Sequence, residues 1–561
     1  MVVKKVRRRV RVLDTSNQTS LFADMEREAV VTAAVAKALL ASRVKFESPD
    51  PRLILINHVR LDEHLKAAGL QAPLRIRPLL DDLSFAEFEK GYRPGGRPPY
   101  APQAMVGLIL YGILQGISSL RDLERCARSD VGCWWLSGGI MPDQSVIGRF
   151  VRQHEALLTA GFFEQLTRQV LNVTGSGTAT VAGDGTVIEA MSSRFHWVRE
   201  EALSEALAEA RKEAEADPDR VQATARLEQL EQARTQLQER QAKQAAKGKA
   251  PTKTQIHPLE PDAVVQPQKN SKDFRASYKP SVLANEMRVI VAYAVHPSSE
   301  TEPVAGLLDR AKALGQIDTA LFDSGYFSEG VIRATGDRAI ELLCPEGQSL
   351  GDDWNKQSDK QFPKSQFEYV AEEDAYRCPN QRMLTPCGQY RGSATSPAYT
   401  EYGTVGWADC PLQPQCTRRA TGRKVKRYAI DTAKDALRAQ LRQDEYRERY
   451  RLRQGMVEPV FSQLRGRQGL RRFRRRGLTG VRVEFALHAM AYNLSRALAW
   501  AACWAFLNGW WAGLRTFRFC LTWLGRTLRV PSPPLAVARL HSGLYLRPAG
   551  PADSGSARKL G

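Results

Sequence analysis

Two short apolar runs of this chain each end in an aspartate. Asp184 follows the run 178–183, and Asp323 follows the run 319–322. Runs of this length and composition are typical of strands buried in a sheet. A carboxylate at the end of a buried strand faces solvent at the edge of the sheet, so the two side chains can converge there on a divalent cation. Such oxygen ligands suit Mg²⁺, which prefers a few carboxylates together with the phosphate oxygens of a substrate.

A third acidic residue, Glu458, stands in the sequence Met-Val-Glu-Pro-Val-Phe, where we expect it to open a helical stretch rich in arginine. It lies 135 positions beyond Asp323, which itself lies 139 positions beyond Asp184. These intervals exceed what a compact α/β core needs, so each is expected to contain an inserted segment.

With these three acidic contexts in this order, the chain resembles the DDE transposases of bacterial insertion sequences. The resemblance extends over about residues 83–498 and includes Tyr450 and Arg453 before Glu458 and Arg465 after it. These residues match the family signature of Tyr, Arg, Glu and Lys/Arg. The chain departs from the signature at one point, because four residues separate Arg453 from Glu458 where the commonest form has three.

The resemblance implies an α/β fold: a ribonuclease-H-like catalytic core with a mixed sheet, a helical N-terminal domain and an inserted β-rich subdomain. It also implies metal-dependent DNA cleavage at insertion-sequence ends and strand transfer into target DNA. The three acidic residues would then hold two Mg²⁺ (or Mn²⁺) ions. The phosphates near the cut would be contacted by Tyr450, Arg453 and Arg465. Two alternatives are a nuclease on the same core that cuts without strand transfer and a non-catalytic DNA-binding regulator derived from a transposase.

The charge of the chain favours double-stranded DNA as the partner, both terminal inverted repeats and target. The formal net charge is +20 at pH 7, and cationic side chains gain affinity for phosphates by releasing counterions. Behind Glu458 lies a segment without any acidic residue that holds seven arginines: Arg465, Arg467, Arg471, Arg472, Arg474, Arg475 and Arg476. We expect this segment to bind DNA. A homodimer or larger assembly is also expected, because two ends must be joined.

After a basic arm and extension over residues 1–80, the region 81–175 is expected to form a helical DNA-binding domain. Asp143 is placed to cap a helix over residues 146–157. Arg149 and Arg152 on that helix are the expected groove contacts, as in a helix-turn-helix reader. A helical bundle that serves only as a scaffold is the alternative.

The catalytic core is assigned to residues 176–344 and 446–500. A helical insertion over residues 199–260 interrupts it, and leucines at helical spacing on either side of Asp217-Pro218-Asp219 predict a two-helix hairpin there. For this hairpin, a role as a solvated spacer and a role in contacting DNA or a second subunit are equally consistent with the sequence. Further along, strands and helices alternate as in a mixed sheet covered by helices, with strands predicted over 289–295 and 340–344 and helices over 302–314 and 328–335.

The inserted subdomain over residues 345–445 contains four cysteines, Cys378, Cys387, Cys410 and Cys416. Their spacing matches no common zinc ribbon or knuckle, and related transposases carry another cysteine where this chain has Trp407. We therefore favour free thiols over a structural Zn²⁺ site. By their location Trp354 and Trp407 are candidates for stacking on a DNA base, although core packing is the preferred role of each.

Residues 501–561 are assigned to a C-terminal apolar helix and tail. The uncharged run 497–514 is long enough for a short membrane span. Its asparagine and glycines, and the arginines just beyond it, favour instead a helix that is buried or faces a second subunit. Because no apolar segment follows the basic residues 1–11, we expect a cytoplasmic, nucleoid-associated protein without a membrane partner.

Overall fold

The computed structural model describes residues 44–527, except 194, 218–219, 247, 249, 269–272, 348–361, 363, 394–396, 405–406 and 420; of residues 365 and 504–527 it describes the backbone alone. The basic arm, Trp354 and the tail beyond residue 527 lie outside the described residues. The chain divides into two compact units, Met1–Trp500 and Ala501–Gly561.

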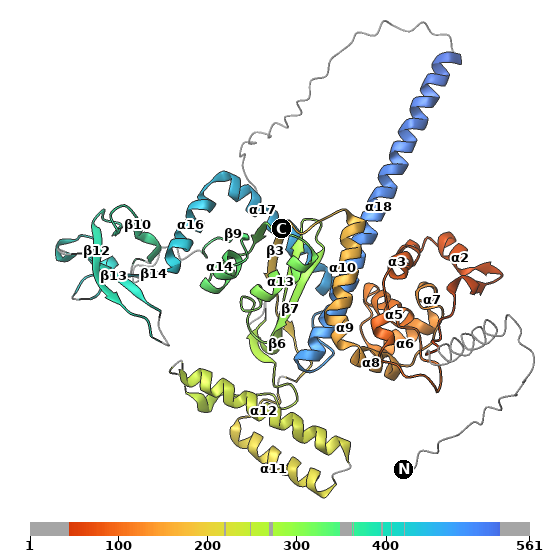
Figure 1. Ribbon diagram of the computed structural model, residues 1–561, viewed down its shortest axis with the longest axis horizontal. Helices are drawn as coiled ribbons and strands as arrows, with labels where there is room; N and C mark the ends of the chain where they lie inside the picture. Colours follow the sequence, from red (N-terminus) through yellow and green to blue (C-terminus); the bar gives the residue numbers. More distant parts are fainter. Residues whose placement is uncertain are drawn as a thin grey trace, which may run out of the picture. The chain divides into compact units, whose positions relative to one another are not determined.

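The N-terminal part of the first unit is helical, as predicted (Figure 1). Its most buried helix is α5, because Pro102–Leu114 is apolar on every face and all but one of its side chains are buried. The predicted cap of α8 is confirmed: Asp143 accepts hydrogen bonds from the N–H groups of Ser145 and Val146. The remaining elements are β1 (Leu55–Ile56), β2 (Val59–Arg60), α2 (Leu61–Ala67), α3 (Gln71–Asp81), α4 (Ala86–Glu89), α6 (Leu120–Ser129), α7 (Val131–Ser137), α8 (Gln144–Gln153), α9 (Glu155–Thr159) and α10 (Gly161–Thr174).

A seven-stranded mixed sheet forms the core, with the order β4-β6-β3-β8-β9 and with β5 and β7 also paired to β6. Strand β3 runs antiparallel to β6 but parallel to β8, which in turn runs parallel to β9. The strands are β3 (Thr180–Gly185), β4 (Ile188–Glu189), β5 (Val264–Pro267), β6 (Phe274–Asn285), β7 (Ile290–His296), β8 (Thr319–Leu321) and β9 (Glu341–Leu343). Helices α13 (Val304–Leu314) and α14 (Glu329–Gly336) connect β7 to β8 and β8 to β9. This mixed sheet with its crossover helices agrees with the expected ribonuclease-H-like core.

Strand β6 is the longest of the sheet and was not predicted. Its first half is rich in polar residues, and Pro280 stands near its middle. Proline is rarely tolerated inside a sheet because it lacks the N–H group for the ladder. Here Pro280 instead offers its carbonyl to the N–H of Thr186, and the strand continues on both sides of it.

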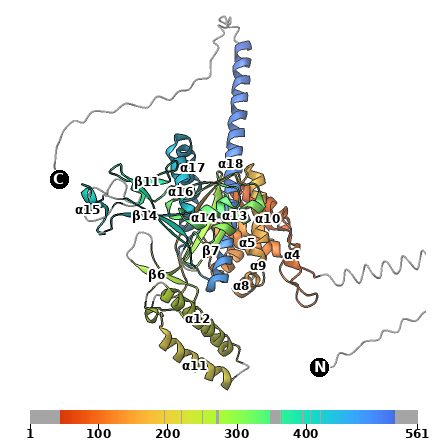
Figure 2. The same ribbon diagram turned by 60° about the vertical axis from the view of Figure 1, so that its left-hand side comes forward.

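The two insertions fold around clusters of their own. Helices α11 (Glu200–Ala216) and α12 (Val221–Ala246) form the predicted hairpin (Figure 2), whose buried seam includes Leu203, Leu207, Leu230 and Leu237. The second insertion is the predicted β-rich subdomain, an antiparallel sheet in the order β10-β11-β12-β13-β14. Its elements are β10 (Glu368–Val370), β11 (Ala375–Arg377), β12 (Met383–Tyr390), β13 (Tyr399–Gly403), β14 (Lys424–Tyr428) and the short helix α15 (Gln413–Cys416).

Three helices complete the described chain: α16 (Ile430–Arg442), α17 (Asp444–Gly466) and α18 (Gly477–Thr527). Helix α17 packs against β3 and β6. The expectation that Glu458 opens a helix is wrong, because α17 begins at Asp444, where acidic residues in its first turn favour the helix N-terminus. The stretch rich in arginine beyond residue 470 lies in the connection between α17 and α18. Of the helices that the structure describes, none is long and apolar enough to cross a membrane.

Candidate active site

The parallel pairing of β3 and β8 brings the two predicted aspartates to one edge of the sheet. The register aligns Ala182 with Leu321, so Asp184 and Asp323 follow at equivalent positions two residues further on. Gly183 lets the strands approach, because a Cβ atom at this position would lie 2.1 Å from the ring of Phe322. The Gly-Asp-Gly sequence therefore has a packing role beside its chemical one.

Arg453 of α17 joins the two carboxylates. Its Nη2 atom lies 3.3 Å from Asp184 Oδ1 and 3.4 Å from Asp323 Oδ2. The same atom donates a 3.3 Å hydrogen bond to the carbonyl of Gly183. Arg453 is buried, with 8% of its surface exposed. We expected it to contact DNA phosphates, but in this structure its guanidinium neutralises the acidic pair.

The surroundings of Asp184 favour its protonated form. Burial raises the pKa of Asp184 to about 6, and the charges of Asp323 and Glu300 add to this effect. The attraction of Arg453 and the hydrogen bond from the Gly185 N–H oppose it. A carboxylate in this position becomes fully ionised most easily when another cation is added beside it.

The two carboxylate oxygens of Asp323 have different partners. Its Oδ1 atom accepts a 2.9 Å hydrogen bond from the Gly325 N–H and so caps the short 3₁₀ turn Ser324–Tyr326. Its Oδ2 atom faces Arg453. Below it, the Cys344 thiol donates to the Asp323 carbonyl at 3.0 Å, and burial raises the pKa of this thiol to about 12. The backbone of Asp323 is thus fixed while its side chain is 42% exposed.

The other signature residues of α17 lie at different depths. Tyr450 is half-buried, and burial raises its pKa, with Asp323 and Asp184 among the charges that act on it. Glu458 is exposed, and its Oε2 atom accepts a 3.2 Å hydrogen bond from Gln454 Nε2. Within the described residues, no three His, Cys, Asp or Glu side chains stand close enough to hold a metal ion. The structure therefore assembles Asp184, Asp323 and Arg453, but does not complete the set with Glu458.

The donor set nevertheless fits a hard divalent cation. Asp184 and Asp323 offer adjacent carboxylate oxygens, the ligand type that Mg²⁺ prefers. The Nε–H group of Arg453 is buried and has no hydrogen-bond partner among the described residues, so it is a free donor beside the pair and not a ligand for the cation. A carboxylate that was not identified from the sequence, Glu300, acts on the same site. It lies in the loop between β7 and α13 and belongs to no recognisable motif, so no sequence signal marked it.

The arginines behind Glu458 differ in how free their side chains are. Arg465 donates to the carbonyl of Val187 at 3.3 Å. Arg472 donates to the carbonyls of Ala190 at 3.1 Å and Met191 at 2.5 Å, which fixes its guanidinium against the end of β4. Exposed positions are occupied by Arg467, Arg471, Arg474 and Arg476. The segment is thus partly structural and partly available to phosphates.

A buried carboxylate fixes the backbone of this arginine-rich segment. Glu484 of α18 accepts hydrogen bonds from the backbone N–H groups of Arg474 and Arg475 at 2.9–3.0 Å. Burial raises the pKa of Glu484 to about 7, against the effect of these two hydrogen bonds. Burial also lowers the pKa of the Arg475 guanidinium. The arginine-rich segment contains no acidic residue of its own, and its backbone is instead held by the carboxylate of Glu484 from α18.

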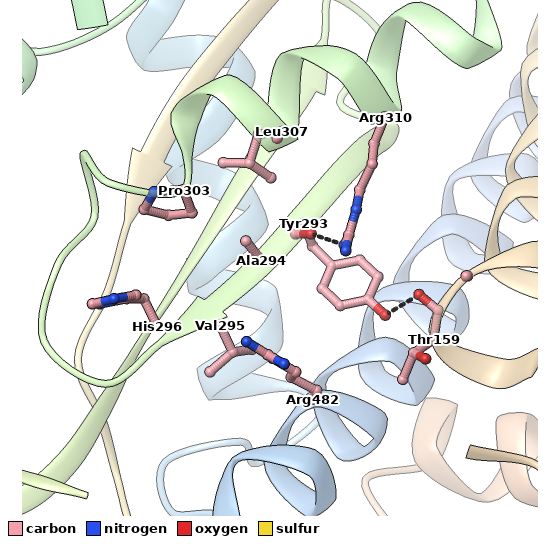
Figure 3. Close-up of a pocket in the computed structure, with 11 residues that line it drawn as sticks. Thr159, Tyr293, Ala294, Val295, His296, Pro303, Leu307, Arg310 and Arg482 are labelled. Carbon is pink, nitrogen blue, oxygen red and sulfur yellow. Dashed lines mark hydrogen bonds between the residues drawn. The ribbon is translucent and has the colours of Figure 1, made fainter. Parts of the chain in front are cut away.

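The cavities among the described residues include two that lie near the helical N-terminal part and outside the acidic site. One, of about 500 Å³, adjoins α8 and is lined by Arg149, Arg97 and Tyr100 among others, while Arg149 and Arg152 are both exposed. The other, of about 360 Å³, is lined by residues of β7, α13 and α18 (Figure 3). In its wall Tyr293 donates to the Thr159 carbonyl at 2.7 Å and its own carbonyl accepts from Arg310 at 2.9 Å. Neither cavity is lined by Asp184 or Asp323.

The cysteines of the β-rich subdomain do not form one group. Cys378, Cys410 and Cys416 line a small apolar cavity together with Trp407. Cys387 lies elsewhere, where its thiol donates to the Glu401 carbonyl at 3.3 Å. Trp407 is half-buried in the wall of this cavity, with its ring against Gly422. The structure thus brings three of the four predicted thiols together.

Comparison with known families gives two matches. Residues 377–498 match the family described as Transposase DDE domain, and residues 71–153 match the family described as Transposase domain (DUF772). The first range includes α17 with Glu458, and the second extends from α3 to α8 with its exposed arginines. Asp184 and Asp323 lie outside both ranges. No curated protein matches the chain.

Proposed function

Because the chain belongs to the DDE transposases of insertion sequences, we propose that it cuts DNA at the ends of such an element and joins the freed 3′ ends to target DNA. One observation carries the proposal: Asp184 near the end of β3 and Asp323 just beyond the neighbouring parallel strand β8 share one guanidinium from α17. The same helix bears Glu458, the proposed third acid. Two carboxylates at one sheet edge beside a basic segment suit phosphodiester chemistry.

Asp184 and Asp323 would hold the divalent cations that act on the phosphodiester, and Glu458 would be the third ligand when DNA is bound. A bound Mg²⁺ (or Mn²⁺) supplies Lewis-acid activation of the attacking oxygen and stabilises the leaving oxygen. Arg453 bridges the two aspartates and offsets their repulsion. The cap that Asp323 forms on the turn after β8 fixes its position before substrate arrives.

The nucleophile needs no side chain of the protein. Water attacks first and frees a DNA 3′-hydroxyl, which then attacks the target phosphodiester at the same site. Covalent attachment of DNA to a serine or tyrosine is therefore not required. Tyr450, Arg465, Arg467 and the exposed arginines beyond them position the phosphates on either side of the cut.

End recognition is assigned to the N-terminal helical region. Helix α6 packs against α8, and α8 presents Arg149 and Arg152 on its exposed side. Arginine on an exposed helix is the usual reader of guanine edges in the major groove. Two copies of the chain, each on one end, form the smallest assembly that joins both ends.

The experiment uses the full-length protein and a supercoiled plasmid that carries the inverted repeats flanking its gene. Wild-type protein with Mg²⁺ should cut at the repeat termini and yield strand-transfer products. Asp184→Asn, Asp323→Asn and Glu458→Gln should abolish cutting while leaving DNA binding within about twofold of wild type. Asp337→Asn, an exposed change at the end of α14, is the matched control and should cut normally.

The alternative functions are outcomes of the same assay. Cutting without joined products would indicate a nuclease. Specific binding by wild-type protein without any cutting would indicate a regulator. A Glu458→Gln protein that cuts at a near-normal rate would remove Glu458 from the site without affecting the two aspartates.

A further inference from the structure

Glu300 lies close to both aspartates although it is distant from them in sequence. It stands in the loop that leaves β7 and precedes α13, and its side chain is 30% exposed. Its Oε1 atom is 3.8 Å from Lys279 Nζ of β6, a weak ion pair. Its charge raises the pKa of Asp184. Glu300 therefore belongs to the electrostatic environment of the site.

Two glycines make room for the Glu300 carboxylate. A Cβ atom at Gly185 would lie 2.7 Å from Glu300 Oε2, closer than real Cβ atoms come. A Cβ atom at Gly325 would lie 3.8 Å from Glu300 Oε1 and 3.1 Å from Asp323 Oδ1. Neither glycine has a positive φ, so what they provide is space rather than an unusual backbone conformation. Because Gly185 follows Asp184 and Gly325 lies two residues after Asp323, Glu300 reaches between the two segments that carry the aspartates.

A buried hydroxyl group faces the same space. Tyr326 is 1% exposed, and its hydroxyl has no hydrogen-bond partner among the described residues. This hydroxyl lies 3.2 Å from the position that a Cβ atom would take at Gly185. The buried Ser281 hydroxyl of β6 lies close enough to act on the pKa of Tyr326, and Ser281 also lacks a hydrogen-bond partner among the described residues. Buried polar groups are rarely left unsatisfied, so their position indicates that a polar ligand or its water shell belongs here.

The charges around this space do not balance. Asp184, Asp323 and Glu300 place three carboxylates around this space, although not close enough to form a ligand set by themselves, whereas Arg453 and Lys279 are the cations paired with them. Arg453 serves the two aspartates, and the Lys279 contact is long. Carboxylate charge that is not fully paired favours the binding of an additional cation. Oxygen ligands, carboxylate charge and open space are what Mg²⁺ or Mn²⁺ requires.

We propose that Glu300 is a further metal-binding residue of the Asp184–Asp323 site and holds the divalent cation through a bound water molecule. The inference rests on the proposed function, because it assumes that the two aspartates bind such an ion. It assigns to this chain an acid from the β7–α13 loop in addition to the three acids of the family signature. The glycines at 185 and 325 then serve the site by leaving Glu300 within reach of it.

Metal binding without DNA tests this inference independently of catalysis. Full-length protein is titrated with Mn²⁺, and free Mn²⁺ is measured by electron paramagnetic resonance. Glu300→Gln should weaken Mn²⁺ binding by about tenfold, the scale of losing one group that supports a metal site. Glu302→Gln is the matched control: it lies in the same loop, pairs with His296 and is 71% exposed. This control should bind Mn²⁺ as wild type does.

A second readout separates metal binding from folding. Mg²⁺ should raise the melting temperature of wild type, because a ligand that binds the folded state alone stabilises it. Glu300→Gln should melt at or above the wild-type temperature in EDTA, since it removes a like charge, yet gain less from Mg²⁺. Glu300→Asp, which keeps the charge on a shorter side chain, should lie between the two in Mn²⁺ affinity.

The outcomes are distinguishable. Wild-type Mn²⁺ affinity in a folded Glu300→Gln protein would overturn the role of Glu300 and leave the proposed function intact. Failure of wild-type protein to bind Mn²⁺ at millimolar concentration would count against the metal-dependent function itself. An equal loss in Glu300→Gln and Glu302→Gln would mean that the loop, rather than the Glu300 carboxylate, affects the site.

Discussion

Replacing Asp184 with asparagine should stabilise the protein at neutral pH while it removes a proposed metal ligand. The folded structure raises the pKa of Asp184 from 3.8 to about 6, chiefly because the side chain is buried. Since the pKa is higher in the folded state, folding favours the protonated form. The stabilising effect is complete below the unfolded pKa and is lost as the pH rises through about 4 to 6. A shift of roughly two units corresponds to about 3 kcal/mol of stability missing from the wild-type protein above pH 7.

Asparagine resembles the protonated aspartic acid and keeps an oxygen that can accept the Gly185 N–H. The attraction between Arg453 and the Asp184 carboxylate already contributes to the pKa of Asp184. The loss of this attraction in the variant therefore adds no further term to the expected change in stability. We therefore expect Asp184→Asn to be more stable than wild type by about 3 kcal/mol at pH 8, and by little at pH 4.

Denaturant unfolding in EDTA across this pH range is the assay, because bound metal would stabilise wild type selectively. Asp337→Asn should change stability by no more than about 0.5 kcal/mol at any pH. A variant at Asp184 that is no more stable than wild type at pH 8, or equally stabilised at pH 4 and pH 8, would refute the reasoning.

Two further predictions concern DNA. Replacing both Arg149 and Arg152 with glutamate should remove the preference for terminal repeats over scrambled duplex, since these side chains are the proposed base contacts. Competition binding at fixed salt measures this preference. Glutamate at Arg471 and Arg474 should instead weaken binding to every duplex and lower the salt slope by about one unit for each lost phosphate contact. Preference retained in the first case, or an unchanged slope in the second, would show that the side chains do not contact DNA as proposed.

Each of these tests has a control in the same segment. Arg125 on α6 is 77% exposed and paired with Asp122, so Arg125→Glu should keep the preference for terminal repeats. Arg472 donates to backbone carbonyls at the end of β4. Its replacement should therefore lower the melting temperature, whereas replacement of the exposed Arg471 should not.

The sequence predicted those parts of the site that depend on local pattern. Apolar runs followed by aspartate correctly marked β3 and β8, because a strand buried on both faces is a short continuous apolar run. Asp143 was placed correctly for a similar reason, since an N-cap is determined by the few residues that follow it. The helix expected to open at Glu458 and to include the arginine run instead begins at Asp444 and ends at Gly466, before most of that run.

What the sequence did not indicate depends on tertiary contacts. The family resemblance suggested a phosphate contact for Arg453, whereas the packing of α17 on β3 places its guanidinium beside Asp184 and Asp323. Glu300 belongs to a loop without periodicity, and only the fold brings that loop between Gly185 and Gly325. Strand β6 was hidden because Pro280 breaks the usual pattern and the sheet compensates through a neighbouring strand.

Cleavage of a terminal-repeat duplex by wild-type protein, with Mg²⁺ or with EDTA and with both products sequenced, tests the central claim most directly. The account predicts a cut at the repeat terminus that leaves a free 3′-hydroxyl, appears only with the divalent cation and disappears in Asp323→Asn. A cut that proceeds in EDTA, that persists in Asp323→Asn or that leaves DNA covalently attached to the protein would contradict it.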